Sequence, residues 1–187
     1  MIYEFCAENV TLLEKAMQAG ARRIELCDNL AVGGTTPSYG VTKAAVELAA
    51  NYDTTIMTMI RPRGGDFVYN ELEIAIMLED IRLTAQAGSQ GVVFGALTAE
   101  KKLDKPNLEK LIAASKGMEI VFHMAFDELS DEDQLEAIDW LSQAGVTRIL
   151  TRAGVSGDSL DKRFAHYHRI LEHVKGKIEI LPGGGID

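Results

Sequence analysis

Two cysteines are the residues of this 187-residue chain whose type and position best indicate chemistry. Cys6 and Cys27 each come at the end of a short run that is typical of a β-strand. If the two strands are parallel neighbours in equal register, their ends bring the thiols close together, with Glu4 and Glu25 one layer deeper. Paired thiols suit soft metals such as Cu(I). The alternative is that each cysteine is a small buried apolar residue, which is a common role for cysteine.

Two methionines offer further soft ligands near the predicted thiol pair. Met57 and Met59 lie two residues apart in a third predicted strand, so both side chains point to the same face. Their thioethers could add to a Cu(I) site if that face is the interior. Methionine also commonly serves as flexible filler in an apolar core, and this alternative stays open.

One histidine is well placed for proton transfer. His123 ends a fifth predicted strand, shares the inward parity of Val121 and is followed closely by Asp127. Such a residue can act as an acid or base or can bind metal, but it can equally be a hydrogen-bonded core group. The candidate catalytic residues are His123, Glu25, Glu8 and Asp127.

An arginine and glycine stretch follows the third predicted strand. Arg61 and Arg63 stand beside Gly64 and Gly65, which combines guanidinium donors with accessible backbone N–H groups. This combination favours an anion site at the end of the strand. The alternative, which is compatible with it, is that the arginines form ion pairs with Glu25 or Asp66, since a buried carboxylate needs such a partner.

A glycine run after the last predicted strand is a second candidate for anion binding. Gly183, Gly184 and Gly185 could expose N–H groups to a phosphate, although glycine also serves tight turns. The chain contains no P-loop and no dinucleotide fingerprint, so we predict no nucleotide cofactor. The partner predicted from these residues is a soft metal ion such as Cu(I) or a small anionic metabolite, and the family resemblance described below specifies copper as the ion.

Composition excludes several classes of protein. Hydrophobic residues make up 47% of the chain and charged residues 25%, which is typical of a globular protein. The net charge of −9 disfavours binding to nucleic acid. No apolar run approaches the roughly 20 residues of a membrane span, so no membrane association is predicted. The first residues do not form a secretory signal, which favours a cytoplasmic location where thiols stay reduced.

Strand and helix patterns alternate along the whole chain. Glycines in Ala19-Gly20-Ala21, Ala87-Gly88-Ser89 and Ala144-Gly145-Val146 mark the ends of helices before strands. The strands are predicted at Tyr3–Ala7, Arg23–Cys27, Thr55–Arg61, Gly91–Gly95, Glu119–His123, Arg148–Thr151 and Lys177–Leu181. The helices are predicted at Val10–Ala19, Val41–Ala50, Glu71–Ala87, Asn107–Ser115, Asp131–Ala144 and Asp158–Val174. This order of βα units predicts an α/β fold with a parallel sheet.

The strands favour a TIM (β/α) barrel over a doubly wound open sheet. Strands of a doubly wound sheet are apolar on both faces, whereas these strands alternate. If Ile24 and Leu26 pack against helices, then Glu25 and Cys27 point into the barrel. Polar residues at the carboxyl ends of barrel strands are the usual material of a functional site.

The same stretches together resemble the CutC copper homeostasis family. The resemblance runs in order along almost the entire chain, and its arginine and glycine stretch is highly specific. The residues that carry it are Phe5–Glu8, Ala19–Cys27, Gly33–Gly40, Met59–Tyr69, Gly91–Gly95, Phe122–Asp127 and Pro182–Gly185.

The resemblance implies a cytoplasmic TIM-barrel protein that handles copper and forms a homo-oligomer. It implies copper ligation by Cys6 and Cys27, whereas a reaction of the family is not agreed. The family usually has arginine where this chain has Met124. We hypothesise that Arg152 compensates for that loss, which requires the two loops to face the same mouth of the barrel.

The length is short for this architecture. A complete (β/α) barrel has eight strands in about 250 residues, whereas residues 1–187 supply about seven units in a single predicted domain. We therefore predict a barrel that lacks its last βα unit and is C-terminally short. Such a barrel should be open between its first and seventh strands, and the glycine site at its end should be incomplete.

Overall fold

The computed structural model describes residues 2–154 and 157–184. Its seven strands are all parallel and lie side by side in the order β1 to β7. The strands are β1 (Glu4–Glu8), β2 (Arg23–Cys27), β3 (Thr55–Met59), β4 (Gly91–Phe94), β5 (Glu119–Phe122), β6 (Arg148–Thr151) and β7 (Glu179–Pro182). The predicted α/β class and parallel sheet are confirmed.

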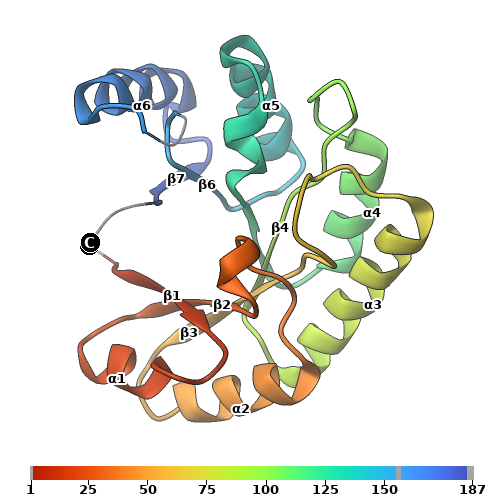
Figure 1. The fold of residues 1–187 in the computed structure, drawn as a ribbon, viewed down its shortest axis with the longest axis vertical. Helices are drawn as coiled ribbons and strands as arrows, with labels where there is room; N and C mark the ends of the chain where they lie inside the picture. The colour runs from red at the N-terminus through yellow and green to blue at the C-terminus, as the bar shows by residue number, and fades with distance from the viewer. Residues whose placement is uncertain (1, 155–156, 185–187) are drawn as a thin grey trace.

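Helices connect the strands and cover the outer face of the curled sheet (Figure 1). The α-helices are α1 (Leu13–Gln18), α2 (Tyr39–Ala49), α3 (Glu71–Ala87), α4 (Lys105–Ala114), α5 (Asp131–Gln143) and α6 (Leu160–Val174), and the short 3-10 helices are η1 (Leu30–Val32) and η2 (Met124–Glu128). Among the described residues, no helix combines the length and apolar character needed to cross a membrane.

The sheet curls as in a TIM barrel but stays open. Figure 1 shows a gap between β1 and β7, with α1 on one side and α6 on the other. Within residues 2–154 and 157–184, no strand pairing joins β7 to β1. The prediction of an open barrel of about seven strands is confirmed.

The alternation of side chains along β2 has the predicted sense. Ile24 and Leu26 are fully buried against α1 and α2, where they contact an apolar cluster that includes Leu13 and Ala45. Cys27, on the opposite face, belongs to a separate cluster inside the curl of the sheet. The other buried members of that interior cluster are Met57, Met59, Val93, Val121 and Leu150. The interior therefore combines sulfur-containing and apolar side chains.

Element boundaries differ from the predictions mainly at the ends. Helix α1 begins at Leu13 rather than Val10, and its N-cap position has no side-chain hydrogen bond. Helix α3 matches its predicted range because Asn70 and Glu73 form a capping box and Gly88 ends the helix with φ +88°. Strand β7 begins at Glu179, two residues later than predicted.

Ion pairs hold the strands at the end of the sheet opposite the candidate site. The Arg148 guanidinium of β6 bonds Glu119 of β5 at 2.7 Å and Glu179 of β7 at 2.9 Å. Arg23 of β2 pairs with Glu4 of β1. Both arginine side chains are nearly buried, and these pairs link neighbouring strands near the residues at which the strands begin. This arrangement leaves the carboxyl ends of the strands free to carry function.

Candidate functional site

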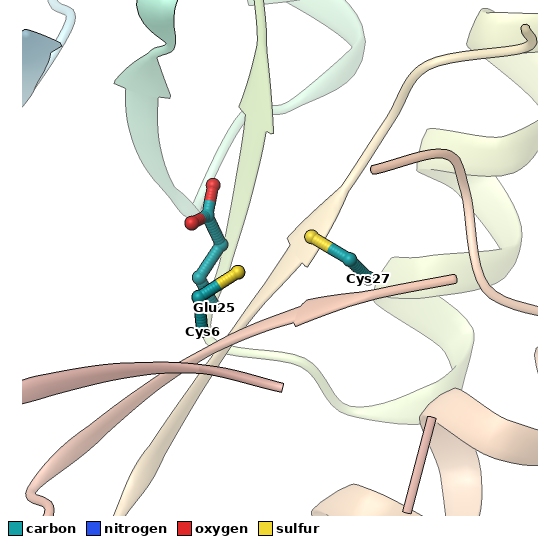
Figure 2. Close-up of side chains that lie close together, drawn as sticks. All are labelled: Cys6, Glu25 and Cys27. Atoms are coloured by element: carbon teal, nitrogen blue, oxygen red, sulfur yellow. The ribbon is translucent and has the colours of Figure 1, made fainter. Parts of the chain in front are cut away.

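The two cysteines and one glutamate meet at the carboxyl ends of β1 and β2. The ligand atoms of Cys6, Glu25 and Cys27 all lie within 4.8 Å of one another. Figure 2 shows the Cys27 sulfur directed toward Cys6 and Glu25. The predicted approach of the two thiols is confirmed, and a carboxylate joins them.

The register of β1 and β2 differs from the equal register that the sequence analysis assumed. Cys6 lies opposite Glu25, and Glu8 lies opposite Cys27, so the thiols are diagonal neighbours. Glu25 is therefore level with Cys6 and belongs to the cluster. Glu4 is the deeper carboxylate, and it is paired with Arg23.

Burial is unequal within the cluster. Cys27 is 1% exposed and Glu25 7% exposed, whereas Cys6 is exposed because β1 is the edge strand of the open sheet. The Glu25 Oε1 atom is buried without a hydrogen-bond partner in the described structure. A buried acceptor of this kind is costly unless a cation or donor satisfies it. The cluster thus offers two sulfurs and one unsatisfied oxygen.

The two thiols of the cluster differ in the direction of their pKa shifts. The hydrogen bond from Cys27 lowers the pKa of Cys6, and the same bond together with burial raises the pKa of Cys27. Burial is the main cause that raises the pKa of Glu25 well above its ordinary value, and the charge of Cys6 adds to it. Cys6 is therefore the first thiol to lose its proton, while Glu25 tends to keep its own.

The surroundings of Cys27 limit the space at the site. A Cβ atom at Gly34 would lie 3.1 Å from the Cys27 sulfur, and Gly34 has φ +87°, so the loop after β2 passes closely over the thiol only because this residue is glycine. Met57 and Met59 are buried in the same interior cluster as Cys27. Both methionines are on the predicted face, and their role as ligands stays a prediction.

Arg61 is buried, and its side chain is hydrogen-bonded to two loops. Its side chain is 4% exposed at the start of the loop after β3, and it donates hydrogen bonds to three backbone carbonyls. The distances are 2.9 Å to Val32, 3.0 Å to Gly34 and 2.7 Å to Gly65. Arg61 therefore ties the loop that covers Cys27 to its own loop.

Arg63 has a different environment from Arg61. It pairs with Glu73 of α3 and with Asp66 at 3.0 Å, and its side chain is 38% exposed. The alternative of an ion pair with Asp66 is thus confirmed for Arg63. Within the described part of the chain, neither arginine has an ion pair with Glu25.

His123 is a buried neutral histidine. It stands just after β5 and is the N-cap of η2, where its Nδ1 accepts a hydrogen bond from the Ala125 N–H at 3.1 Å. Burial, helped by the Arg61 charge, lowers the pKa of His123 to about 3. Because Nδ1 is an acceptor, the single proton of the neutral ring is on Nε2. The Nε2 atom has no hydrogen-bond partner in the described structure.

The environment of His123 predicts a distinctive NMR titration. We expect the ring to stay neutral, with its proton on Nε2, as the pH falls from about 8 to about 4. The chain has four histidines, and the others are His166, His168 and His173. Long-range ¹H–¹⁵N spectra of the histidine rings will show whether one ring keeps constant shifts. A His123 ring that protonates near pH 6.5 would contradict the assigned burial.

The lowered pKa of His123 also makes the stability of the folded protein depend on pH. The folded protein holds His123 neutral down to a pKa of about 3, whereas the unfolded chain binds that proton near pH 6.5. Between these values the unfolded state binds more protons, so this contribution to stability is lost as the pH falls. We expect His123→Phe to remove this part of the pH dependence in urea unfolding.

The remaining candidate carboxylates form hydrogen bonds to backbone groups. Asp127 accepts hydrogen bonds from the Thr151 hydroxyl and from the Arg152 N–H at 2.9 Å. Glu8 accepts from the Leu30 N–H at 2.6 Å, which fixes the loop after β2. Both residues therefore join neighbouring loops at the mouth, and their proposed catalytic roles stay predictions.

The glycine loop after β7 is tied to β6 and α6. The Gly183 N–H donates to the Thr151 carbonyl at 3.0 Å, and Arg163 donates to the carbonyls of Gly183 and Gly184. The predicted anion-binding N–H of Gly183 is thus already bonded. Gly185 lies outside the described residues.

Met124, which stands where the resembling family usually has arginine, lies beside Arg152 as the hypothesis of compensation requires. The Arg152 Nη2 atom lies 3.9 Å from the Met124 sulfur, so the loops after β5 and β6 face the same mouth. This satisfies the geometric condition for compensation by Arg152, while compensation in function stays a prediction.

Two aromatic residues were not singled out as site residues from the sequence. Phe67 contacts both Arg61 and His123, and the Tyr69 hydroxyl is a buried atom without a hydrogen-bond partner in the described structure. Burial raises the pKa of Tyr69 to about 12. The available signal was their place in the same loop as Arg61 and Arg63.

Sequence comparison identifies the family. A family model described as the CutC family matches residues 1–187. This chain belongs to the CutC family. A CutC family protein of Enterococcus faecalis is 50% identical over 186 residues, covering 100% of this chain and 89% of the relative. A human protein named copper homeostasis protein cutC homolog is 40% identical, covering 99% of this chain and 65% of the relative.

Solved structures agree with the CutC assignment. The chain superposes on a Streptococcus agalactiae protein, named as a copper homeostasis protein CutC, with a TM-score of 0.96 and 45% identity, covering 100% of this chain and 89% of that one. A deoxyribose phosphate aldolase from Aeropyrum pernix gives a TM-score of 0.69 at 14% identity, covering 99% of this chain and 76% of the aldolase. The second likeness concerns the TIM-barrel fold alone.

Proposed function

We propose that this CutC protein binds copper as Cu(I) through Cys6 and Cys27, with Glu25 as a third ligand. The proposal is supported above all by the convergence of these three side chains, whose ligand atoms lie within 4.8 Å of one another. Relatives named as copper homeostasis proteins add support from the family. The role inferred for the chain is copper homeostasis.

The donor set fits the chemistry of a soft monovalent ion. Thiolate sulfur is a preferred ligand of Cu(I), and the cluster supplies two thiols. The orphaned Glu25 Oε1 is the kind of buried acceptor that a cation satisfies. Cys6 is exposed and Cys27 is buried, so the proposed site joins one accessible thiol to one enclosed thiol.

A competition titration tests this proposal. The reduced protein is titrated with Cu(I) against a coloured Cu(I) chelator, and X-ray absorption at the copper edge identifies the ligands. We expect one copper per chain with sulfur ligands. Copper that fails to compete with the chelator, or that shows only nitrogen and oxygen neighbours, would exclude this site.

Copper affinity should rise with pH. A proton on Cys27 and one on Glu25 are favoured at neutral pH, because the hydrogen bond with Cys6 and burial raise the pKa of Cys27 and burial raises the pKa of Glu25. Metal binding must displace such protons. Each proton released makes the affinity rise about tenfold per pH unit. Apparent dissociation constants measured between about pH 6 and pH 8 will check this. Affinity that is independent of pH would show that thiols are not the ligands.

The setting of the proposed function is a reducing cytoplasm. Free thiols such as Cys6 and Cys27 persist there, whereas an oxidising compartment favours their conversion to disulfides. A copper ion is the proposed partner. A homo-oligomer is proposed from the family resemblance, and analytical ultracentrifugation of the purified chain tests it.

A further inference from the structure

We propose that Arg61 and His123 form a second binding site, separate from the thiol cluster, for the terminal oxygen of a small oxyanion. Arg61 and His123 are each 4% exposed at the carboxyl-end mouth of the barrel. Each has one buried side-chain nitrogen without a hydrogen-bond partner in the described structure, namely Arg61 Nε and His123 Nε2. The site involves fewer residues than the arginines and glycines that the sequence suggested for anion binding.

Within the described part of the chain, no carboxylate neutralises the charge of the buried Arg61 guanidinium. Its Nη atoms donate to the carbonyls of Val32, Gly34 and Gly65, which are neutral groups. Among residues 2–154 and 157–184, no aspartate or glutamate lies within ion-pair distance of it, whereas Arg63 has both Asp66 and Glu73. A buried charge without a counter-charge is costly. An anion at the free Nε would reduce that cost.

His123 adds a second donor of defined direction. Its Nδ1 is occupied by the Ala125 N–H, so the ring presents Nε2–H. The ring position depends on Gly95 at the end of β4, where a Cβ atom would come within 2.7 Å of His123 Cε1. Arg61 Nε and His123 Nε2 are both N–H donors, so together they select a ligand atom that accepts. The oxygen of a phosphate or carboxylate is such an atom.

Phe67 connects this donor pair to open space. Its ring centroid lies 4.9 Å from Arg61 Cζ and 4.8 Å from the His123 ring centroid. The same side chain lines a hollow of about 570 Å³, together with Val68, Leu97 and others. Rotation of the half-buried Phe67 ring would let a small anion pass from the hollow to the two nitrogens. Both N–H groups of Nη1 donate to the carbonyls of Val32 and Gly34, so an anion binds on the Nε side of the guanidinium.

The test uses two probe anions on the copper-free protein. Inorganic phosphate and acetate are titrated separately at constant ionic strength, while ring ¹H–¹⁵N spectra follow the four histidines and calorimetry measures affinity. We expect at least one anion to shift the His123 Nε2 resonance and leave the other three unshifted. Phosphate alone would assign a phosphoryl ligand, acetate alone would assign a carboxylate, and either result supports the site. If neither anion shifts His123, the proposal is overturned.

Matched variants make the test specific. His123→Phe, which keeps an aromatic ring, should weaken anion binding at least tenfold, whereas His168→Phe makes the same change at an exposed position of α6 and should not. Equal binding by both variants would overturn the site. Should His123→Phe not fold, the shift confined to His123 in the unmodified protein decides. Cys6→Ser should keep anion binding, so failure of this proposal and failure of the copper proposal are distinguishable.

Discussion

Replacing Cys27 with serine is expected to lower the Cu(I) affinity by more than about 100-fold. Changes to outer groups that only orient metal ligands already cost about 10–100-fold, so loss of a thiolate ligand should cost more. Cys6→Ser should have a comparable effect because both sulfurs belong to one cluster. Chelator competition at fixed pH on the reduced proteins measures both changes.

Glu25 allows a finer comparison with a matched control. Glu25→Gln keeps the size of the side chain and an oxygen that can bind the ion, and Cu(I) prefers sulfur to oxygen ligands, so we expect a smaller loss than for a thiolate, about tenfold. Glu8→Gln makes the same change on the neighbouring strand, outside the cluster, and should leave the affinity unchanged. Thermal unfolding of the copper-free variants shows whether each is folded. Wild-type affinity in both folded cysteine variants would remove this cluster as the copper site.

Arg61→Met is expected to destabilise the protein by about 3 kcal/mol or more. The change leaves the carbonyls of Val32, Gly34 and Gly65 without their donor, and each unmet buried acceptor costs about 1–3 kcal/mol. For a chain of this size, such a loss corresponds to a fall in Tm of roughly 6–12 °C. Calorimetry and urea unfolding at neutral pH measure it.

Arg63→Met is the natural control for Arg61→Met. Its ion pairs with Asp66 and Glu73 involve a side chain that is 38% exposed, and pairs of this kind contribute about 0–1 kcal/mol. We therefore expect a small change in Tm. Equal effects of the two substitutions would show that Arg61 does not hold the loops as described.

The β2 strand illustrates what can be predicted about the fold. The alternation in Arg23–Cys27 predicted which side chains contact helices and which point inward, and the structure confirms both faces. Alternation is a property of the extended backbone and is readable without tertiary contacts. The boundary at Lys177 was wrong because a strand begins where its neighbour offers hydrogen bonds, and β6 offers them to Glu179.

The candidate site was predictable in its residues but not in its geometry. Residue type and strand position selected Cys6 and Cys27, and the inward parity of Glu25 was also correct. The diagonal register that makes Glu25 level with Cys6 depends on how two strands pair. Local sequence does not specify that pairing, because it is set by the packing of both strands against α1 and α2.

Arg61 and Arg63 show most clearly what could not be predicted from the sequence. Both have the same chemistry and lie two residues apart, so the sequence supported one shared interpretation. Tertiary structure separated them, since Arg61 is buried among the carbonyls of a loop 27–29 residues earlier while Arg63 reaches Glu73 on α3.

By itself, the sequence determined the order of βα units, the two faces of β2 and the family to which the chain belongs. These depend on periodicity and residue type, which are local. Only the tertiary structure decided which donors remain free at the mouth of the barrel, because that depends on loops that meet across the sheet. Burial then determines which polar atoms are hydrogen-bonded, because a buried polar atom can bond only to the segment that the fold places beside it.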